Sequence, residues 1–328
     1  MSATSRCPFD AAVETFLRVG RDVFQQPRPD GSFPRQFHRK AHACVRAKFT
    51  VEPPAEGALR RGLFAKAGAY PAMIRFSNAM MEQDEIPDVR GMASKLKGVE
   101  GEVCEGAPPG QQDFILVSQP AMPFQNVSDA AHMFKELERA GELTPAKMAL
   151  PRYVFHTLNP FRARWAYVRL TLAAAWQTFT RVPLASMSYF SGTPYQLGET
   201  AVKYECHPDG RAFRPKKHRR SSFRDALQAS LRHGPVGFNF FVRPEGPHDD
   251  PVNADAAAWT GPLVQAGRIE IPAQEIAETF GLEEKISFNP WNCLKAHTPL
   301  GGINAARQVA YRASAERRGA TASFPSEI

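Results

Sequence analysis

The chain has 328 residues, 43% of them hydrophobic and 23% charged, with a mean hydropathy of -0.36, which describes a soluble globular protein able to bury a substantial core. Its net charge of +8 admits nucleic acid, anionic lipid or an anionic ligand as a partner. Five scattered cysteines, an odd number without a C-x-x-C pair, argue against a disulfide scaffold or a zinc site and favour a reducing compartment. The first ten residues lack the apolar core of a secretory signal, so we expect a cytoplasmic protein.

Two stretches could suggest other partners. The basic run 214–220 (Arg-Pro-Lys-Lys-His-Arg-Arg) has no interleaved aromatic residues, so we interpret it as a solvated loop and expect no nucleic-acid partner. The longest apolar stretch, 165–179, contains Arg169 and is too short to cross a bilayer. It predicts a packed or a surface-seeking helix, without stable membrane insertion.

The N-terminal part begins with a helix and continues into a strand. Asp10 can cap a helix that runs to about Phe24, and a Pro- and Gly-rich crossing follows. From residue 45 to residue 51 apolar and polar residues alternate, which predicts a half-buried strand. His42 stands just before this strand, three residues after Arg39, and taken alone it is either a structural histidine or a catalytic one.

Two further strands carry polar residues at regular positions. In residues 72–78 the alternation places Arg75 and Ser77 on one face, either as the wet side of a sheet or as part of a site. In residues 88–95 Gly91 indicates a bulge or a close backbone approach. Residues 113–118 form a buried strand by length and composition, with Gln111 just upstream and Phe124 downstream.

The middle of the chain is mainly helical, and the last part returns to strand. We predict helices at 128–141, 162–181 and 222–232, and strands at 188–204, 236–242 and 268–271. No repeat or flexible linker divides the chain.

The final helix has the most informative pattern. Pro299 and a Gly-Gly pair precede it, and nothing from residue 303 to residue 318 interrupts it. At 3.6 residues per turn, Arg307, Tyr311 and Arg318 lie within roughly 40° of one another. The stripe is either a half-buried tyrosine between solvated arginines or a phenolate site, because a guanidinium one turn away favours the anion.

Several of these motifs resemble those of the haem catalases. Arg307-x-x-x-Tyr311 with a later arginine resembles their proximal haem-ligand helix, Arg39-x-x-His42-Ala their distal segment, and Arg75-Phe-Ser77 a third motif of the family. The chain is thus similar to short members of the catalase-like haem protein family, over most of residues 35–318. The resemblance implies an α+β fold, an antiparallel β-barrel with surrounding helices, built as a single domain of residues 1–328 with an N-terminal helix and arm at 1–34.

The resemblance also implies a haem b site with assigned roles. Tyr311 would be the iron ligand, a role that the phenolate has in catalase, and Arg307 would keep it ionised. His42 would be the distal base, held by Ser77, and Gln111 or Gln112 would replace an asparagine that catalases carry. The expected haem contacts are Arg39, Arg75, Phe124 and Arg318.

The function implied is that of a haem-dependent peroxidase or catalase-related enzyme, which reduces hydrogen peroxide or organic hydroperoxides through a ferryl intermediate. Typical catalases have valine before the distal histidine, and Ala41 stands before His42 here, which favours bulkier hydroperoxides. The alternatives are a fatty-acid hydroperoxide isomerase and a haem-binding protein without turnover. The long arm and flavodoxin-like region of larger catalases are not seen, so we expect at most a small homo-oligomer.

Overall fold

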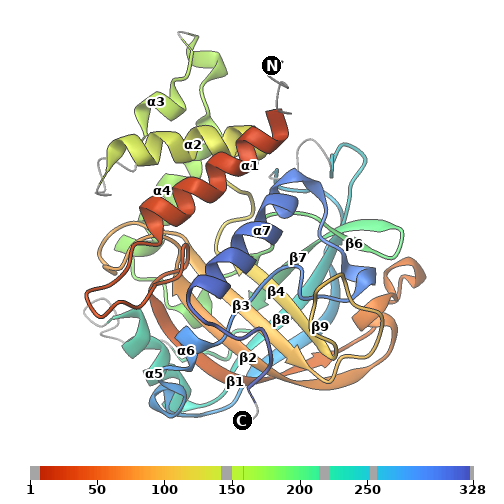
Figure 1. The fold of residues 1–328 in the computed structure, drawn as a ribbon. Coiled ribbons are helices and arrows are strands. Elements are labelled where there is room, and N and C mark those ends of the chain that lie inside the picture. Colours follow the sequence, from red (N-terminus) through yellow and green to blue (C-terminus); the bar gives the residue numbers. More distant parts are fainter. Residues whose placement is uncertain (1–7, 142–149, 158, 214–221, 252–256, 326–328) are drawn as a thin grey trace.

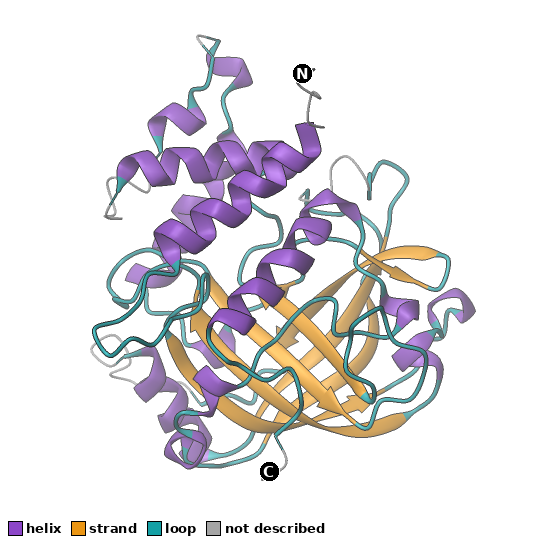
Figure 2. Cartoon of the chain, in the orientation of Figure 1, coloured by secondary structure: helices purple, strands orange, loops and turns teal. Residues whose placement is uncertain are grey.

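Eight antiparallel strands form a closed barrel at the centre of the structure, and a ninth strand pairs with one of them; the structure is a computed structural model that describes residues 8–141, 150–157, 159–213, 222–251 and 257–325 (Figure 1; Figure 2). Their order is β5-β4-β3-β2-β1-β9-β8-β7-β6, and an additional pairing of β5 with β7 closes the sheet. The strands are β1 (Ala41–Val51), β2 (Gly68–Asn78), β3 (Arg90–Lys97), β4 (Gln111–Val117), β5 (Tyr189–Phe190), β6 (Tyr195–Leu197), β7 (Thr200–Pro208), β8 (Val236–Pro244) and β9 (Val264–Ile271). The predicted α+β fold with an antiparallel barrel is confirmed.

The alternation in the sequence decides which side chains enter the barrel. On β2, Ile74 and Phe76 join the barrel core, so Arg75 and Ser77 lie on the outer surface, on one face as the pattern predicted. The interior is filled by buried aromatic rings, among them Phe49, Phe114, Tyr204 and Phe240. A barrel filled in this way leaves room for a ligand only outside its strands.

The helices lie outside the barrel, and α7 crosses it in front of β3 and β4 (Figure 1). The helices α1, α2 and α3 share a second apolar cluster with the first half of α7, separate from the barrel core. The helices are α1 (Pro8–Val19), α2 (Val127–Ala140), α3 (Pro151–Val154), α4 (Trp165–Phe179), α5 (Phe223–His233), α6 (Leu282–Lys285) and α7 (Gly301–Arg317). A π-helical turn, Gly20–Phe24, continues α1 to the residue at which the sequence predicted the end of the helix.

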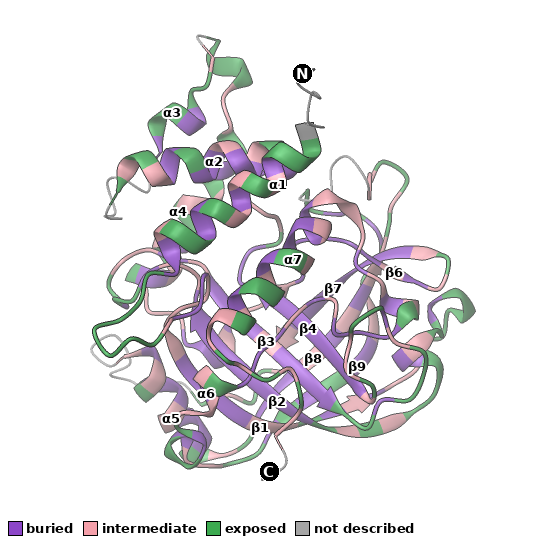
Figure 3. Cartoon of the chain, in the orientation of Figure 1, coloured by how far each residue is buried: buried purple, intermediate pink, exposed green. Residues whose placement is uncertain are grey.

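The apolar stretch forms α4. As Figure 3 shows, buried residues predominate in the barrel strands, whereas the surrounding helices also carry exposed residues. Trp176 and Phe179 are each 70% exposed, while Ala174 and Thr178 are buried. In the part of the chain that the structure covers, no helix has the length and apolar character needed to span a membrane. The basic run 214–220 lies outside the described residues.

Candidate functional site

A cavity lies between α7 and the outer surface of the barrel. Its volume is about 60 Å³, and it is open to solvent on one side. The barrel side contributes the residues before β1 and parts of β2, β3 and β4, and α7 closes the opposite side. The lining residues with polar side chains are Arg35, Gln36, His38, Arg75, Ser77, Tyr311 and Ser314.

The helix α7 brings a phenol and a guanidinium to the cavity, as its stripe predicted. Tyr311 lines the cavity, and Nη2 of the buried Arg307 donates to its Oη at 3.4 Å. Nη1 of Arg307 donates to Thr193 Oγ1 at 2.9 Å and to Asn304 Oδ1 at 3.0 Å, both of them neutral acceptors. The positive charge is therefore not neutralised by a carboxylate in these contacts.

Three arginines converge near one end of the cavity. Guanidinium nitrogens of Arg35 donate to the carbonyls of Glu283 and Ile286, Arg75 donates to Glu283 O at 3.2 Å, and Arg318 donates to Glu284 O at 2.7 Å. Among these contacts the only carboxylate is that of Glu284, 3.8 Å from Arg75 Nη2 and partly exposed.

In this cluster of three arginines, the positive charge exceeds the nearby negative charge, and some of the hydrogen-bond donors have no acceptor. The Nε atoms of Arg35 and Arg318 are buried and have no hydrogen-bond partner in the described structure. Burial and the charges of Arg75 and Arg318 lower the pKa of Arg35, and burial lowers that of Arg318 to about 10. Such a cluster binds anions, and a ligand with carboxylate groups fits it.

His38 provides an imidazole on the barrel side of the cavity. Its Nδ1 lies 3.0 Å from Ser77 Oγ, and its backbone has a φ of 57°, which is uncommon for a residue other than glycine. Opposite Ser77 on β3, Gly91 leaves space for the ring, because a Cβ there would lie 2.4 Å from His38 Nδ1. The close backbone approach predicted at Gly91 is therefore present.

His38 is uncharged in the folded protein near neutral pH. Burial, together with the charges of Arg75, Arg307 and Arg35, lowers the pKa of His38 to about 3, so the ring is neutral near pH 7. The bond with Ser77 engages Nδ1 and leaves Nε2 as the nitrogen available for proton transfer.

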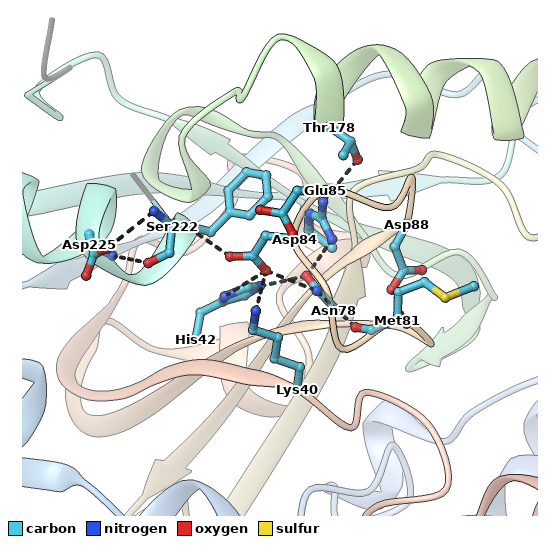
Figure 4. A network of polar contacts seen from close by, with 12 residues as sticks. Lys40, His42, Asn78, Met81, Asp84, Glu85, Asp88, Thr178, Ser222 and Asp225 are labelled. Atoms are coloured by element: carbon cyan, nitrogen blue, oxygen red, sulfur yellow. Dashed lines mark hydrogen bonds and ion pairs between the residues drawn. The ribbon is translucent and has the colours of Figure 1, made fainter. Parts of the chain in front are cut away.

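His42, the histidine that the sequence pattern favoured, does not line the cavity. It belongs to a buried polar network in which its Nε2 is 2.7 Å from Asn78 Oδ1 and its Nδ1 is 4.0 Å from Asp84 Oδ1 (Figure 4). Asp84 also pairs with Lys40 at 2.7 Å. A bulge in the β1–β2 pairing between Ala41 and Ala43 sets the local register at His42.

The spacing Arg-x-x-His occurs twice, four residues apart, and this explains the difference. Arg35-Gln-Phe-His38 precedes β1 and lines the cavity, whereas His42 is already the second residue of β1. Arg39 pairs with Glu82 at 3.2 Å and does not line the cavity either. The earlier copy of the motif was the signal that sequence reasoning missed.

Two other expected residues lie elsewhere. Gln111 is the first residue of β4, and the cavity is lined by Ile115 and Leu116 further along that strand. Phe124 packs in the helical cluster, 6.4 Å from the ring of Phe134. Ala41, the residue before His42, does not line the cavity. Phe37, the residue before His38, does line it.

The chain resembles catalases in both sequence and fold, although no family model matches it. A catalase-related peroxidase of Mycolicibacterium paratuberculosis is 25% identical over 301 residues, which cover 80% of this chain and 87% of that protein. A fungal catalase structure has a TM-score of 0.64 at 15% identity and covers 94% of this chain. Catalase A from Saccharomyces cerevisiae has a TM-score of 0.63 at 16% identity, also over 94%, and a bacterial catalase one of 0.59 at 14% identity over 98%.

The chain is shorter than these catalases, since the matches cover 62%, 64% and 62% of the three solved chains. The structural likeness concerns the barrel and its helices, and the sequence similarity extends over most of a peroxidase of comparable length. In fold the chain is similar to catalases, and in sequence it is similar to a catalase-related peroxidase.

Proposed function

We propose that this protein is a haem-dependent enzyme that reduces peroxides. The observation that carries the proposal is the composition of one cavity, which combines the Tyr311 phenol beside Arg307, an arginine cluster with unsatisfied donors, and the neutral imidazole of His38. Among the described residues no group of three His, Cys, Asp or Glu side chains is suited to a metal ion. The iron would therefore be held by a porphyrin and one phenolate oxygen.

The side chains fit haem b. Tyr311 would supply the oxygen that holds the iron, and Arg307 would donate a hydrogen bond to that oxygen. Arg35, Arg75 and Arg318 would bind the propionates, because the two carboxylates would accept hydrogen bonds from the Nε donors of Arg35 and Arg318. When bound, haem supplies the redox-active iron at which the oxygen–oxygen bond of a peroxide is broken.

His38 takes the role of the distal base in place of His42. Its neutral Nε2 removes the proton from one peroxide oxygen and delivers it to the other, as a general acid and base. Ser77 holds the ring by Nδ1, and Gly91 lets the ring approach the barrel closely enough for that bond.

The wall of the cavity favours organic hydroperoxides over hydrogen peroxide. From β4 the lining is apolar, with Ile115 and Leu116, and Phe37 adds an aromatic ring beside His38. An apolar wall binds an alkyl group by removing it from water and offers no hydrogen bond to a second peroxide oxygen. Isomerisation of a fatty-acid hydroperoxide is a second function that the same wall would serve.

The test uses two matched pairs of variants. Tyr311→Phe should lose haem or change its ferric spectrum, whereas Tyr70→Phe, in which the hydroxyl removed lies on β2 away from the cavity, should keep both unchanged. His38→Ala should keep haem and lose ~10²–10⁴-fold in turnover of cumene hydroperoxide. His42→Ala should keep that turnover. A Tyr311→Phe protein with full haem and an unaltered spectrum would overturn the proposal.

A further inference from the structure

Two cysteines that are 189 positions apart in the sequence meet beside the segment that leads into α7. Val103 and Leu294 form an isolated antiparallel bridge, and the next pair outward is Cys104 with Cys293. The backbone N–H of Cys104 donates to Cys293 O at 2.9 Å, and the two Sγ atoms are 3.5 Å apart. Directly opposed residues in antiparallel strands have Cα atoms ~4.5–5.5 Å apart, which is within the range that a disulfide requires.

The two thiols have different access to solvent. Cys104 is 6% exposed and lies in the loop between β3 and β4, where its neighbours Glu102, Glu105 and Gly106 are exposed. Cys293 is fully buried behind it. A small oxidant arriving from solvent therefore reaches Cys104 first.

The surroundings also favour the thiolate form at Cys104. The contact with Cys293 Sγ lowers the pKa of Cys104, with smaller contributions from Thr298 Oγ1, 3.4 Å away, and from Lys295, while the contact with Cys104 and burial raise the pKa of Cys293. Lys295 also pairs with Glu102 at 2.7 Å, so its charge is shared. Cys104 is thus the nucleophilic sulfur and Cys293 the protonated thiol beside it.

We propose that Cys104 and Cys293 form a second peroxide-reactive site, a dithiol that a peroxide oxidises to a disulfide. The Cys104 thiolate attacks one peroxide oxygen, an S–O bond forms as the O–O bond breaks, and the departing alkoxide or hydroxide takes up a proton. Cys293 then loses its proton and attacks the sulfenic sulfur, so that an S–S bond forms and the S–O oxygen leaves as water. In sum, two thiols and one peroxide give one disulfide, one alcohol or water, and one further water.

The disulfide would connect the β3–β4 loop to the segment around Cys293 that leads into α7. Trp291 Nε1 donates to Asn304 O at 2.8 Å, and Asn304 Oδ1 accepts from Arg307. The segment that Cys293 belongs to is thus already hydrogen-bonded to the first turns of α7. Oxidation would tie this segment to the barrel by a covalent bond in addition.

The experiment follows the bond directly. The purified protein, reduced and freed of reductant, is treated with hydrogen peroxide or with cumene hydroperoxide, and disulfide-linked peptides are identified by mass spectrometry. We expect one major linkage, between the peptides of Cys104 and Cys293. In Cys293→Ser, dimedone should trap a sulfenic acid at Cys104, and in Cys104→Ser neither product should form.

Cys44→Ser and Cys206→Ser are the matched controls, because both thiols are buried elsewhere and both variants should still form the linkage. If the linkage forms in Tyr311→Phe to the same extent as in the parent, the dithiol reacts without help from the haem site. Absence of the linkage after a several-fold excess of either peroxide, or an unmodified Cys104 in Cys293→Ser, would overturn the inference.

Discussion

Replacing Gly91 with alanine should displace His38 without removing any polar group of the cavity. A Cβ at this position would lie 2.4 Å from His38 Nδ1 and 2.8 Å from Ser77 Oγ. Ordinary contact with a Cβ begins at 3.4 Å, so the imidazole must retreat by about 1 Å (3.4 − 2.4). The Nδ1–Oγ distance is 3.0 Å now, and a retreat of that size ends the hydrogen bond.

A misplacement of ~1 Å in a catalytic group can cost ~10²-fold in rate. We therefore expect Gly91→Ala to lower the turnover of cumene hydroperoxide per bound haem by about 10²-fold, with an unchanged haem content. The control is Gly57→Ala, because a Cβ at Gly57 meets nothing within 4 Å. In a His38→Ala background the same change should cost nothing further, since the displaced ring is gone. Full turnover in Gly91→Ala, or an equal loss in both backgrounds, would refute the reasoning.

Three other predictions concern buried or lining side chains. His42→Ala should destabilise the fold by ~1–3 kcal/mol, measured by urea unfolding, because Asn78 Oδ1 loses its imidazole partner. Phe37→Ala should lower kcat/KM for cumene hydroperoxide relative to hydrogen peroxide, because the aromatic ring that would contact the alkyl group is lost, and an unchanged ratio would exclude this wall as a determinant. Burial lowers the pKa of His297 to about 3, so its neutral form stabilises the native state fully above pH ~6.5, and that stability is lost as the pH falls toward 3. Between pH 6.5 and 5 the loss is about 2 kcal/mol, and His297→Gln should show a correspondingly shallower pH dependence of unfolding.

The sequence predicted the parts of the site that depend on a regular period. Arg307 and Tyr311 lie four positions apart on an uninterrupted helix, so their proximity follows from 3.6 residues per turn. Arg75 and Ser77 share a face because side chains alternate along a strand. In both cases local geometry alone was sufficient.

Which histidine lines the cavity could not be predicted in this way, because it depends on where β1 begins. Arg35 and His38 precede the strand, while Arg39 and His42 have the same spacing, and only the pairing register distinguishes the two sets. Gln111 shows a similar limit. It precedes Ile115 by four positions on β4, about 13 Å of extended chain. It therefore lies on the same strand as Ile115 but does not line the cavity.

The pairing of β1 with β9 has a consequence for the synthesis of the protein. Val51 at the end of β1 and Val264 at the start of β9 are 213 positions apart (264 − 51), and at ~5–20 residues per second the ribosome needs roughly 10–40 s to make the intervening chain. During that interval the outer edge of β1 exposes unpaired N–H and C=O groups, which can pair with another nascent chain. The yield of native protein should therefore respond to temperature and to chaperone supply during translation.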